Sequence, residues 1–216
     1  PAHPLHGSNS GPLLLSPSTP TIAMRVHRRL KSDLAEHPSD PQMLARAIAQ
    51  RRQNVTLART QLGTQPDDTT ARGILARELK ALGDLLTLSR DLDEAETLLR
   101  ESIDHWIGLK RTKAKVLTQL KLVTALRLQR RFSEALDLVE RLAERSRDEP
   151  DLHVYMPFIL VERGIVYHHM ARPRLADQDL NVARERFALQ GARRQMEQTD
   201  QVLDFIKKKE GGPPPH

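Results

Sequence analysis

Two adjacent histidines, His168 and His169, are the feature of this 216-residue sequence that most resembles a metal site. Neighbouring residues on a helix point about 100° apart, whereas two helical ligands of one ion need an offset of three or four residues. No helical carboxylate completes a ligand set with them. We therefore interpret both histidines as groove-lining or surface residues, and we predict no metal site.

A catalytic set is also missing. The sequence has no glycine-rich phosphate loop, no nucleophile elbow and no histidine-pair zinc motif. It contains no cysteine, which removes disulfides, thiolate ligands and cysteine nucleophiles. Glu94, Glu96 and Glu101 have the spacing of a solvated helix face. The sequence therefore predicts a non-catalytic protein without a cofactor.

The distribution of charge is more informative than the formal net charge of +6. Residues 100–131 hold nine Lys or Arg against two acidic residues, and residues 132–151 hold seven acidic residues against three Arg. Three interpretations of the basic stretch stay open: a solvated helix face, a surface for an acidic protein partner, and a nucleic-acid surface. Only Trp106 and Phe132 could offer stacking, which disfavours the third. Trp106 itself is interpreted as a core residue, with an interface anchor as the alternative.

No run is long enough to cross a bilayer, and the leucines at 13–15 are too few for a secretory signal. The default expectation is a soluble, cytoplasmic protein. The basic amphipathic stretch 22–34 is interpreted as an N-terminal cap of the fold, in preference to a membrane-surface helix. A start at Pro1 fits a third hypothesis, an interaction module of a larger signalling protein.

Apolar periodicity divides the chain into helices between two irregular tails. Residues 1–21 and 210–216 are rich in Pro or Gly and predict disorder. Residues 22–70 hold two helices, which form either a cap or a degenerate repeat; Asp40 is expected to cap the second and Gly63 to end it.

The region 71–190 is predicted to contain three pairs of helices with short connections, which force antiparallel packing. The expected helices are 71–89 with 92–108, 112–130 with 132–147, and 153–171 with 174–189. Asp91 and Glu94 form a candidate capping box. Pro157 predicts that its helix begins or kinks there. A last helix at about 192–209 has one polar face and is expected to cap the array over residues 191–209.

The pairs share one pattern, spaced 40 and 41 residues apart and marked by Ala95, Ala135 and Ala176 where two helices must cross closely. One amphipathic hairpin cannot bury its apolar stripe without neighbours, so a fixed period in this range indicates stacked helix pairs. The predicted fold class is all-α: an α-solenoid of antiparallel helix pairs.

This pattern resembles the tetratricopeptide repeat, most clearly at residues 129–136. That family has an apolar-Gly pair and a Leu or Tyr on the first helix, then Ala, an apolar residue and a small residue on the second. These places are held by Leu82, Gly83, Leu86, Ala95, Leu99 and Ser102; by Leu122, Val123, Leu126, Ala135, Val139 and Leu142; and by Arg163, Gly164, Tyr167, Ala176, Leu180 and Ala183. The departures are Val123, Leu142, Arg163 and a period longer than the usual ~34 residues.

The resemblance implies a concave groove, lined by first helices, that takes a peptide or a partner helix. Carried over by position, the partner-binding residues are Arg77, Lys80, Asp84, Lys121, Thr124, Arg127, Phe158, Glu162, Ile165, His168 and His169. Asp84 and Thr124 replace the Asn residues of the family's chaperone-binding members, which argues against a chaperone carboxylate clamp. We expect a scaffold or adaptor for an acidic or amphipathic segment of a partner protein. The alternative is a nucleic-acid-associated regulatory protein that uses residues 100–131.

Overall fold

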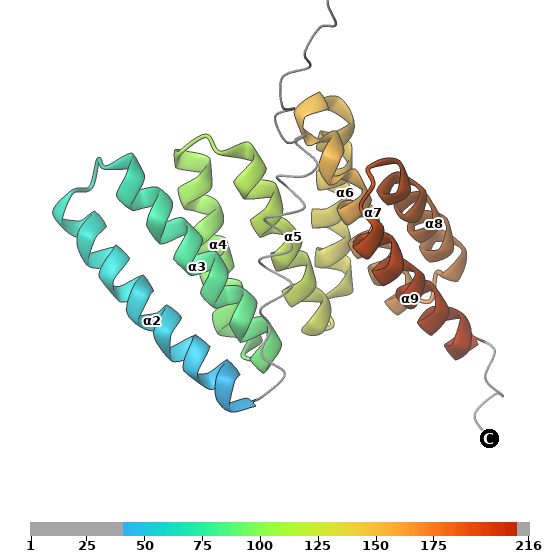
Figure 1. The fold of residues 1–216 in the computed structure, drawn as a ribbon, viewed down its shortest axis with the longest axis horizontal. Helices are drawn as coiled ribbons and strands as arrows, with labels where there is room; N and C mark the ends of the chain where they lie inside the picture. The colour runs from blue at the N-terminus through green and yellow to red at the C-terminus, as the bar shows by residue number, and fades with distance from the viewer. Residues whose placement is uncertain (1–40, 211–216) are drawn as a thin grey trace, which may run out of the picture. The chain divides into compact units, whose positions relative to one another are not determined.

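A computed structural model describes the backbone of residues 41–210 and the side chains of residues 41–208. The elements in this range are α2 (Pro41–Thr64), α3 (Thr69–Ser89), α4 (Leu92–Gly108), α5 (Thr112–Leu128), α6 (Phe132–Asp148), the 3₁₀ helix η1 (Pro150–Tyr155), α7 (Met156–His169), α8 (Pro173–Leu189) and α9 (Arg193–Glu210). The described residues contain no strand, and consecutive helices pack against one another in chain order (Figure 1). The prediction of an all-α fold is confirmed. The expectations for residues 1–40, including Asp40, and for residues 211–216 lie outside the described range.

One type of turn reverses the chain at five connections between described helices. The backbone N–H two or three residues past the end of the helix donates to a carbonyl five residues earlier, in the pairs Asp91–Leu86, Arg111–Trp106, Arg131–Leu126, Arg172–Tyr167 and Ala192–Phe187. This is the long bond of a Schellman turn, and it needs a left-handed residue in between. That residue is Arg90, Lys110, Arg130, Ala171 or Gly191, with φ from 53° to 71°. The repeat of about 40 residues therefore contains two helix-and-turn units of similar length.

The start of α7 follows from proline chemistry. Pro157 is the second residue of α7, where its missing N–H costs nothing. The preceding residues form η1, which itself begins with Pro150. The predicted boundary at Pro157 is observed as a helix start, and no kink is needed.

The predicted capping box is wrong. Asp91 precedes α4 but its side chain makes no capping hydrogen bond, and its carboxylate instead accepts one from the Ser89 hydroxyl at 2.6 Å. Glu94 binds Arg52 of α2 at 2.6 Å. The tight turn before α4 directs the Asp91 carboxylate toward Ser89. The carboxylates of Asp91 and Glu94 therefore bind Ser89 and Arg52. Gly63 also does not end its helix, which continues to Thr64.

The predicted close crossings are present. Ala95, Ala135 and Ala176 are fully buried. A β-carbon added at Gly83 would lie 2.8 Å from Cγ of Leu99, and one at Gly164 would lie 2.9 Å from Cγ of Leu180. Because real β-carbons do not approach so closely, α3–α4 and α7–α8 can pack at this distance only with glycine at the crossing.

The second helix of the predicted N-terminal region, α2, lies beside both α3 and α4. Its Val55 and Ala58 are buried in the core formed with α3. Arg52 and Arg59 pair with Glu94 and with Glu101 of α4. A similar ion pair joins Arg131, just before α6, to Glu96 of α4.

A buried ion pair explains the departure at Arg163, which occupies an apolar place in the repeat pattern. Its guanidinium donates to both oxygens of Asp179 on α8, at 2.6 and 2.8 Å, and Asp179 is only 6% exposed. The same guanidinium lies 5.7 Å from the ring centre of Tyr167, whose hydroxyl donates to Glu140 on α6. These contacts tie α6, α7 and α8 together. Trp106 is 7% exposed, as expected for a core residue.

Candidate interaction surfaces

The polar residues predicted for the groove form two clusters that join the first helices of the three pairs. In the first, the carboxylate of Asp84 on α3 lies 3.0 Å from Nζ of Lys80 and 3.6 Å from Nζ of Lys121 on α5. In the second, Glu162 on α7 accepts a hydrogen bond from Thr124 at 3.1 Å and lies 3.7 Å from Nε of Arg127. We call the surface formed by these six residues the first-helix face.

The charge of this face is positive but partly neutralised. Together with Arg77 it carries four cationic side chains against the carboxylates of Asp84 and Glu162. Asp84 stands where a chaperone clamp would hold Asn, and it pairs with the two lysines that the clamp would need. Both lysines of the face are therefore partly neutralised by one carboxylate.

The remaining predicted residues are distributed differently. Phe158 packs edge-on against Phe187 of α8, with ring centres 4.8 Å apart. His169 stacks on Phe132 at the start of α6, with centres 5.2 Å apart, and the ring of His168 lies 5.7 Å from that of His169. Arg77 is exposed, and Ile165 is half-buried. The structure thus joins six of the eleven predicted residues in the two clusters, and it places Phe158 and His169 against neighbouring second helices.

The basic stretch 100–131 does not form one uniform surface. Its charges pair with carboxylates in several places: Arg100 and Arg131 with Glu96, Lys113 with Asp151, Lys121 with Asp84, and Arg127 with Glu162. Burial raises the pKa of Glu96, but hydrogen bonds from Arg100, Gln129 and Arg131 outweigh this and hold the pKa below its usual value. Burial and the nearby Arg145 lower the pKa of Lys115. Five of the nine cations of this stretch are thus paired with carboxylates.

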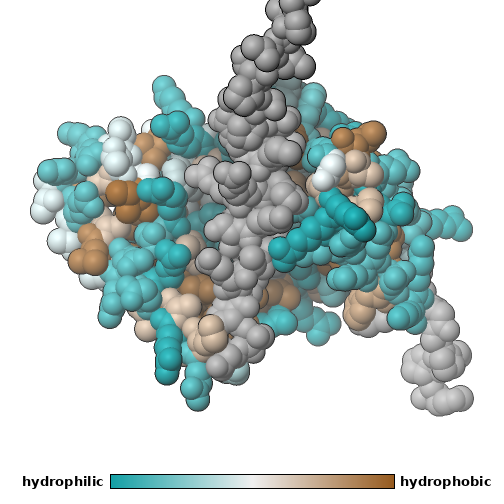
Figure 2. Space-filling model, viewed as in Figure 1, coloured by the Kyte–Doolittle hydropathy of each residue, from teal (hydrophilic) through white to brown (hydrophobic). Residues whose placement is uncertain are grey.

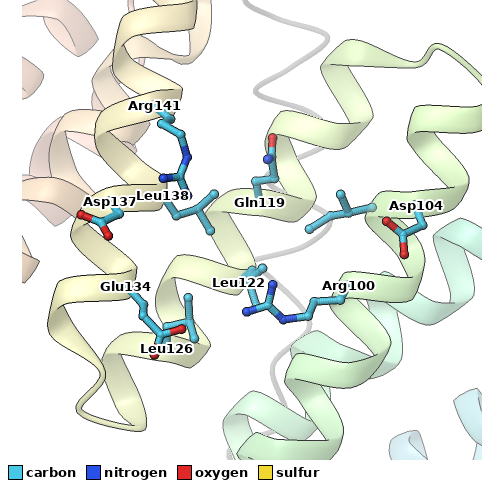
Figure 3. Close-up of a pocket in the computed structure, with 10 residues that line it drawn as sticks. Arg100, Asp104, Gln119, Leu122, Leu126, Glu134, Asp137, Leu138 and Arg141 are labelled. Atoms are coloured by element: carbon cyan, nitrogen blue, oxygen red, sulfur yellow. The ribbon is translucent and has the colours of Figure 1, made fainter.

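A cleft lies among α4, α5 and α6, away from the residues predicted from sequence (Figure 3). Its volume is about 540 Å³. We call it the α4–α6 cleft, and it is lined by Arg100, Ile103, Asp104, Gln119, Leu122, Leu126, Glu134, Asp137, Leu138 and Arg141. Leu122 and Leu126 belong to the buried core, whereas Asp104, Asp137 and Arg141 are exposed at the rim. Sequence reasoning missed this site, although Val123 at the crossing gave a signal for it.

The described surface visible in Figure 2 is mostly hydrophilic, with small separate apolar patches. Exposed large apolar residues are scattered over several helices, among them Leu57 on α2 and Leu189 at the end of α8. Single exposed apolar side chains are ordinary on protein surfaces. Recognition on the visible side of the described residues would therefore depend largely on polar groups.

Comparison with known proteins gives no assignment: no family model, no curated protein and no solved structure matches this chain. None of the helices between residues 41 and 210 is long and apolar enough to cross a membrane. Among the described residues, no three His, Asp or Glu side chains converge as metal ligands would. The function of this chain must therefore be inferred from its two surfaces, the first-helix face and the α4–α6 cleft.

Proposed function

We propose that this chain is a non-catalytic scaffold of the tetratricopeptide-like type, whose first-helix face binds an acidic or amphipathic segment of a partner protein. In this proposal the helix pairs form an α-solenoid. Its last helix, α9, acts as the cap: Leu203 and Ile206 pack toward Leu180, while Glu197 and Asp204 on the same helix are exposed.

The observation that supports the binding face most directly is the pair of clusters across α3, α5 and α7. Asp84 of α3 lies close to Lys80 of the same helix and to Lys121 of α5. Glu162 of α7 accepts a hydrogen bond from Thr124 and lies close to Arg127, both on α5. These contacts hold polar groups from three pairs in a fixed register before a partner arrives. A preformed surface of this kind loses little conformational entropy on binding.

The partner chemistry follows from the charge on this face. Four cations outnumber two carboxylates, so a partner segment with spaced Asp or Glu residues would gain favourable interactions that a basic segment would not. Its apolar side chains would meet α7 near Ile165.

Fluorescence anisotropy with a labelled, glutamate-rich amphipathic peptide tests the proposal at low salt. The double variant Arg77→Gln, Lys121→Gln should bind about fivefold more weakly than the wild-type chain, since each charge pair contributes up to ~0.5 kcal/mol. The matched control is Arg186→Gln with Lys207→Gln, which removes the same charge from exposed positions on α8 and α9. Equal affinities for the test and control variants would exclude the first-helix face as the binding site.

A further inference from the structure

The α4–α6 cleft exists because the middle pair of helices crosses differently from the other two. At the places of Gly83 and Gly164, the middle pair has Val123, which is fully buried. The distance between packed helices depends on the side chains at their contact, so a valine separates α5 from α6 further than a glycine would. In agreement, α5 and α6 share a smaller contact region than α3–α4 or α7–α8 do.

The cleft combines an apolar floor with charged walls. Leu122 and Leu126 of α5 form the floor together with Ile103 of α4. Its volume of about 540 Å³ lies within the usual range of ligand pockets, ~300–1,000 Å³. The cleft can therefore take one or two large side chains of a bound segment.

Three charged groups at the rim form no ion pair with a described residue, although the charge of Asp104 acts on the neighbouring His105. Asp104 on α4 and Asp137 on α6 stand on opposite walls, and neither takes part in an ion pair or hydrogen bond with a described residue (Figure 3). The same holds for Arg141. By contrast, Arg100 and Glu134 at this rim are already paired, with Glu96 and Arg131.

A buried polar atom adds an independent sign of a missing partner. Gln119 of α5 lines the cleft, and its Oε1 atom is buried without a hydrogen bond. Buried acceptors in folded proteins are nearly always satisfied, because an unpaired one costs free energy. A donor group on a bound segment would satisfy it if the Gln119 side chain rotates toward the cleft.

We infer that the α4–α6 cleft is a second binding site, which takes a basic amphipathic segment of a partner protein. Aliphatic side chains of the segment enter the cleft, and Lys or Arg on either side of them pair with Asp104 and Asp137. The sign of the charge supports this choice: the rim has three carboxylates against two arginines, on a chain whose formal net charge is +6. Such a local reversal steers cations to the cleft and repels acidic segments.

This site is separate from the first-helix face. On α5, Gln119, Leu122 and Leu126 line the cleft, whereas Lys121, Thr124 and Arg127 belong to the first-helix face. By helical spacing the two sets lie on opposite sides of α5. One chain could thus hold an acidic segment on one side and a basic segment on the other, and either proposal can fail alone.

The probe for the test is a labelled, end-blocked helical peptide with leucines at positions i and i+4 and lysines beside them, compared with a peptide in which glutamates replace the lysines. Anisotropy is measured with the full chain. We expect the lysine peptide to bind the wild-type chain and to bind about fivefold more weakly to the variant Asp104→Asn, Asp137→Asn. The glutamate peptide, which the proposed first-helix face would bind, should lose no affinity in that variant. The control variant, Asp177→Asn with Glu185→Gln on α8, removes the same charge and should bind normally.

A second variant tests the apolar floor. Leu138→Trp places a larger side chain in the cleft while every charge stays, and it should reduce binding of the lysine peptide at least tenfold, with helicity unchanged by circular dichroism. Absence of lysine-peptide binding by the wild-type chain would overturn the inference, as would normal binding of the lysine peptide by the double Asp variant. An equal loss of affinity for both peptides in that variant would also overturn it. Concentration-dependent self-association that is lost on Leu138→Trp would assign the cleft to a second copy and would also overturn it.

Discussion

The close crossing of α3 and α4 offers a sharp test of the packing argument, because two glycines in α3 have opposite surroundings. A β-carbon at Gly83 would lie 2.8 Å from Cγ of Leu99 and 3.3 Å from the carbonyl oxygen of Ala95. A β-carbon at Gly73 would meet only Cδ1 of Leu109, at an ordinary 3.8 Å. The perturbation is alanine at each position.

The magnitudes follow from two opposing effects. Alanine stabilises a helix interior by about 1 kcal/mol relative to glycine, and this gain applies at both positions. At Gly83 overpacking costs ~1–3 kcal/mol, because the backbone oxygen of Ala95 cannot move aside as a side chain end can. Gly73→Ala should therefore raise the free energy of unfolding by up to ~1 kcal/mol, and Gly83→Ala should lower it by up to ~2 kcal/mol.

Urea unfolding followed by circular dichroism measures both values, and thermal unfolding should show shifts of about 2–4 °C per kcal/mol. The variants share a helix and a substitution type, so each serves as the other's control. If Gly83→Ala proves as stable as Gly73→Ala, the crossing is not tight, and the explanation of the α4–α6 cleft by Val123 loses its basis.

Three further measurements test other parts of the structure. Asp179→Ala leaves the guanidinium of Arg163 without its buried partner and should lower the free energy of unfolding in urea by about 2–3 kcal/mol, less than for a fully buried pair because that guanidinium is partly solvated. The control is Asp177→Ala, at an exposed position on the same helix, which should change the stability little. Equal losses in the two variants would contradict the buried pair. Lys110 has a φ of 53°, so Lys110→Gly should stabilise the chain by about 1 kcal/mol, and a loss of stability would show that the turn does not need a left-handed residue there. Although burial raises the pKa of Glu96, its hydrogen bonds hold the pKa below the ordinary value, so its contribution to stability is complete above the ordinary pKa and is lost as the pH falls through the folded value. Glu96→Gln should therefore flatten the dependence of the urea midpoint on pH in this acidic range, and an unchanged slope would contradict the assignment.

Part of this fold could be predicted because helices and close crossings depend on local sequence. Apolar residues at helical spacing predicted the helices between residues 71 and 209 to within a few residues, and Pro157 marked the start of α7. The small residues Ala95 and Ala176 marked crossings because a larger side chain does not fit there. The turns were harder to recognise, since four of the five left-handed residues are not glycine. Asp91 was misassigned as a cap because sequence does not show which way a turn directs a carboxylate.

The sequence by itself determined which stretches are helical, where pairs of helices must approach closely, and that the predicted first-helix residues carry more positive than negative charge. Only the tertiary structure decided how those charges are used: Asp84 joins lysines 41 residues apart in the chain, and Phe158 and His169 pack against second helices. It also decided that α4, α5 and α6 together line one cleft. The physical reason is that helix formation and close crossing depend on residues near in sequence, whereas pairing of charges and the shape of a cleft depend on distances between helices, which no single stretch of sequence contains.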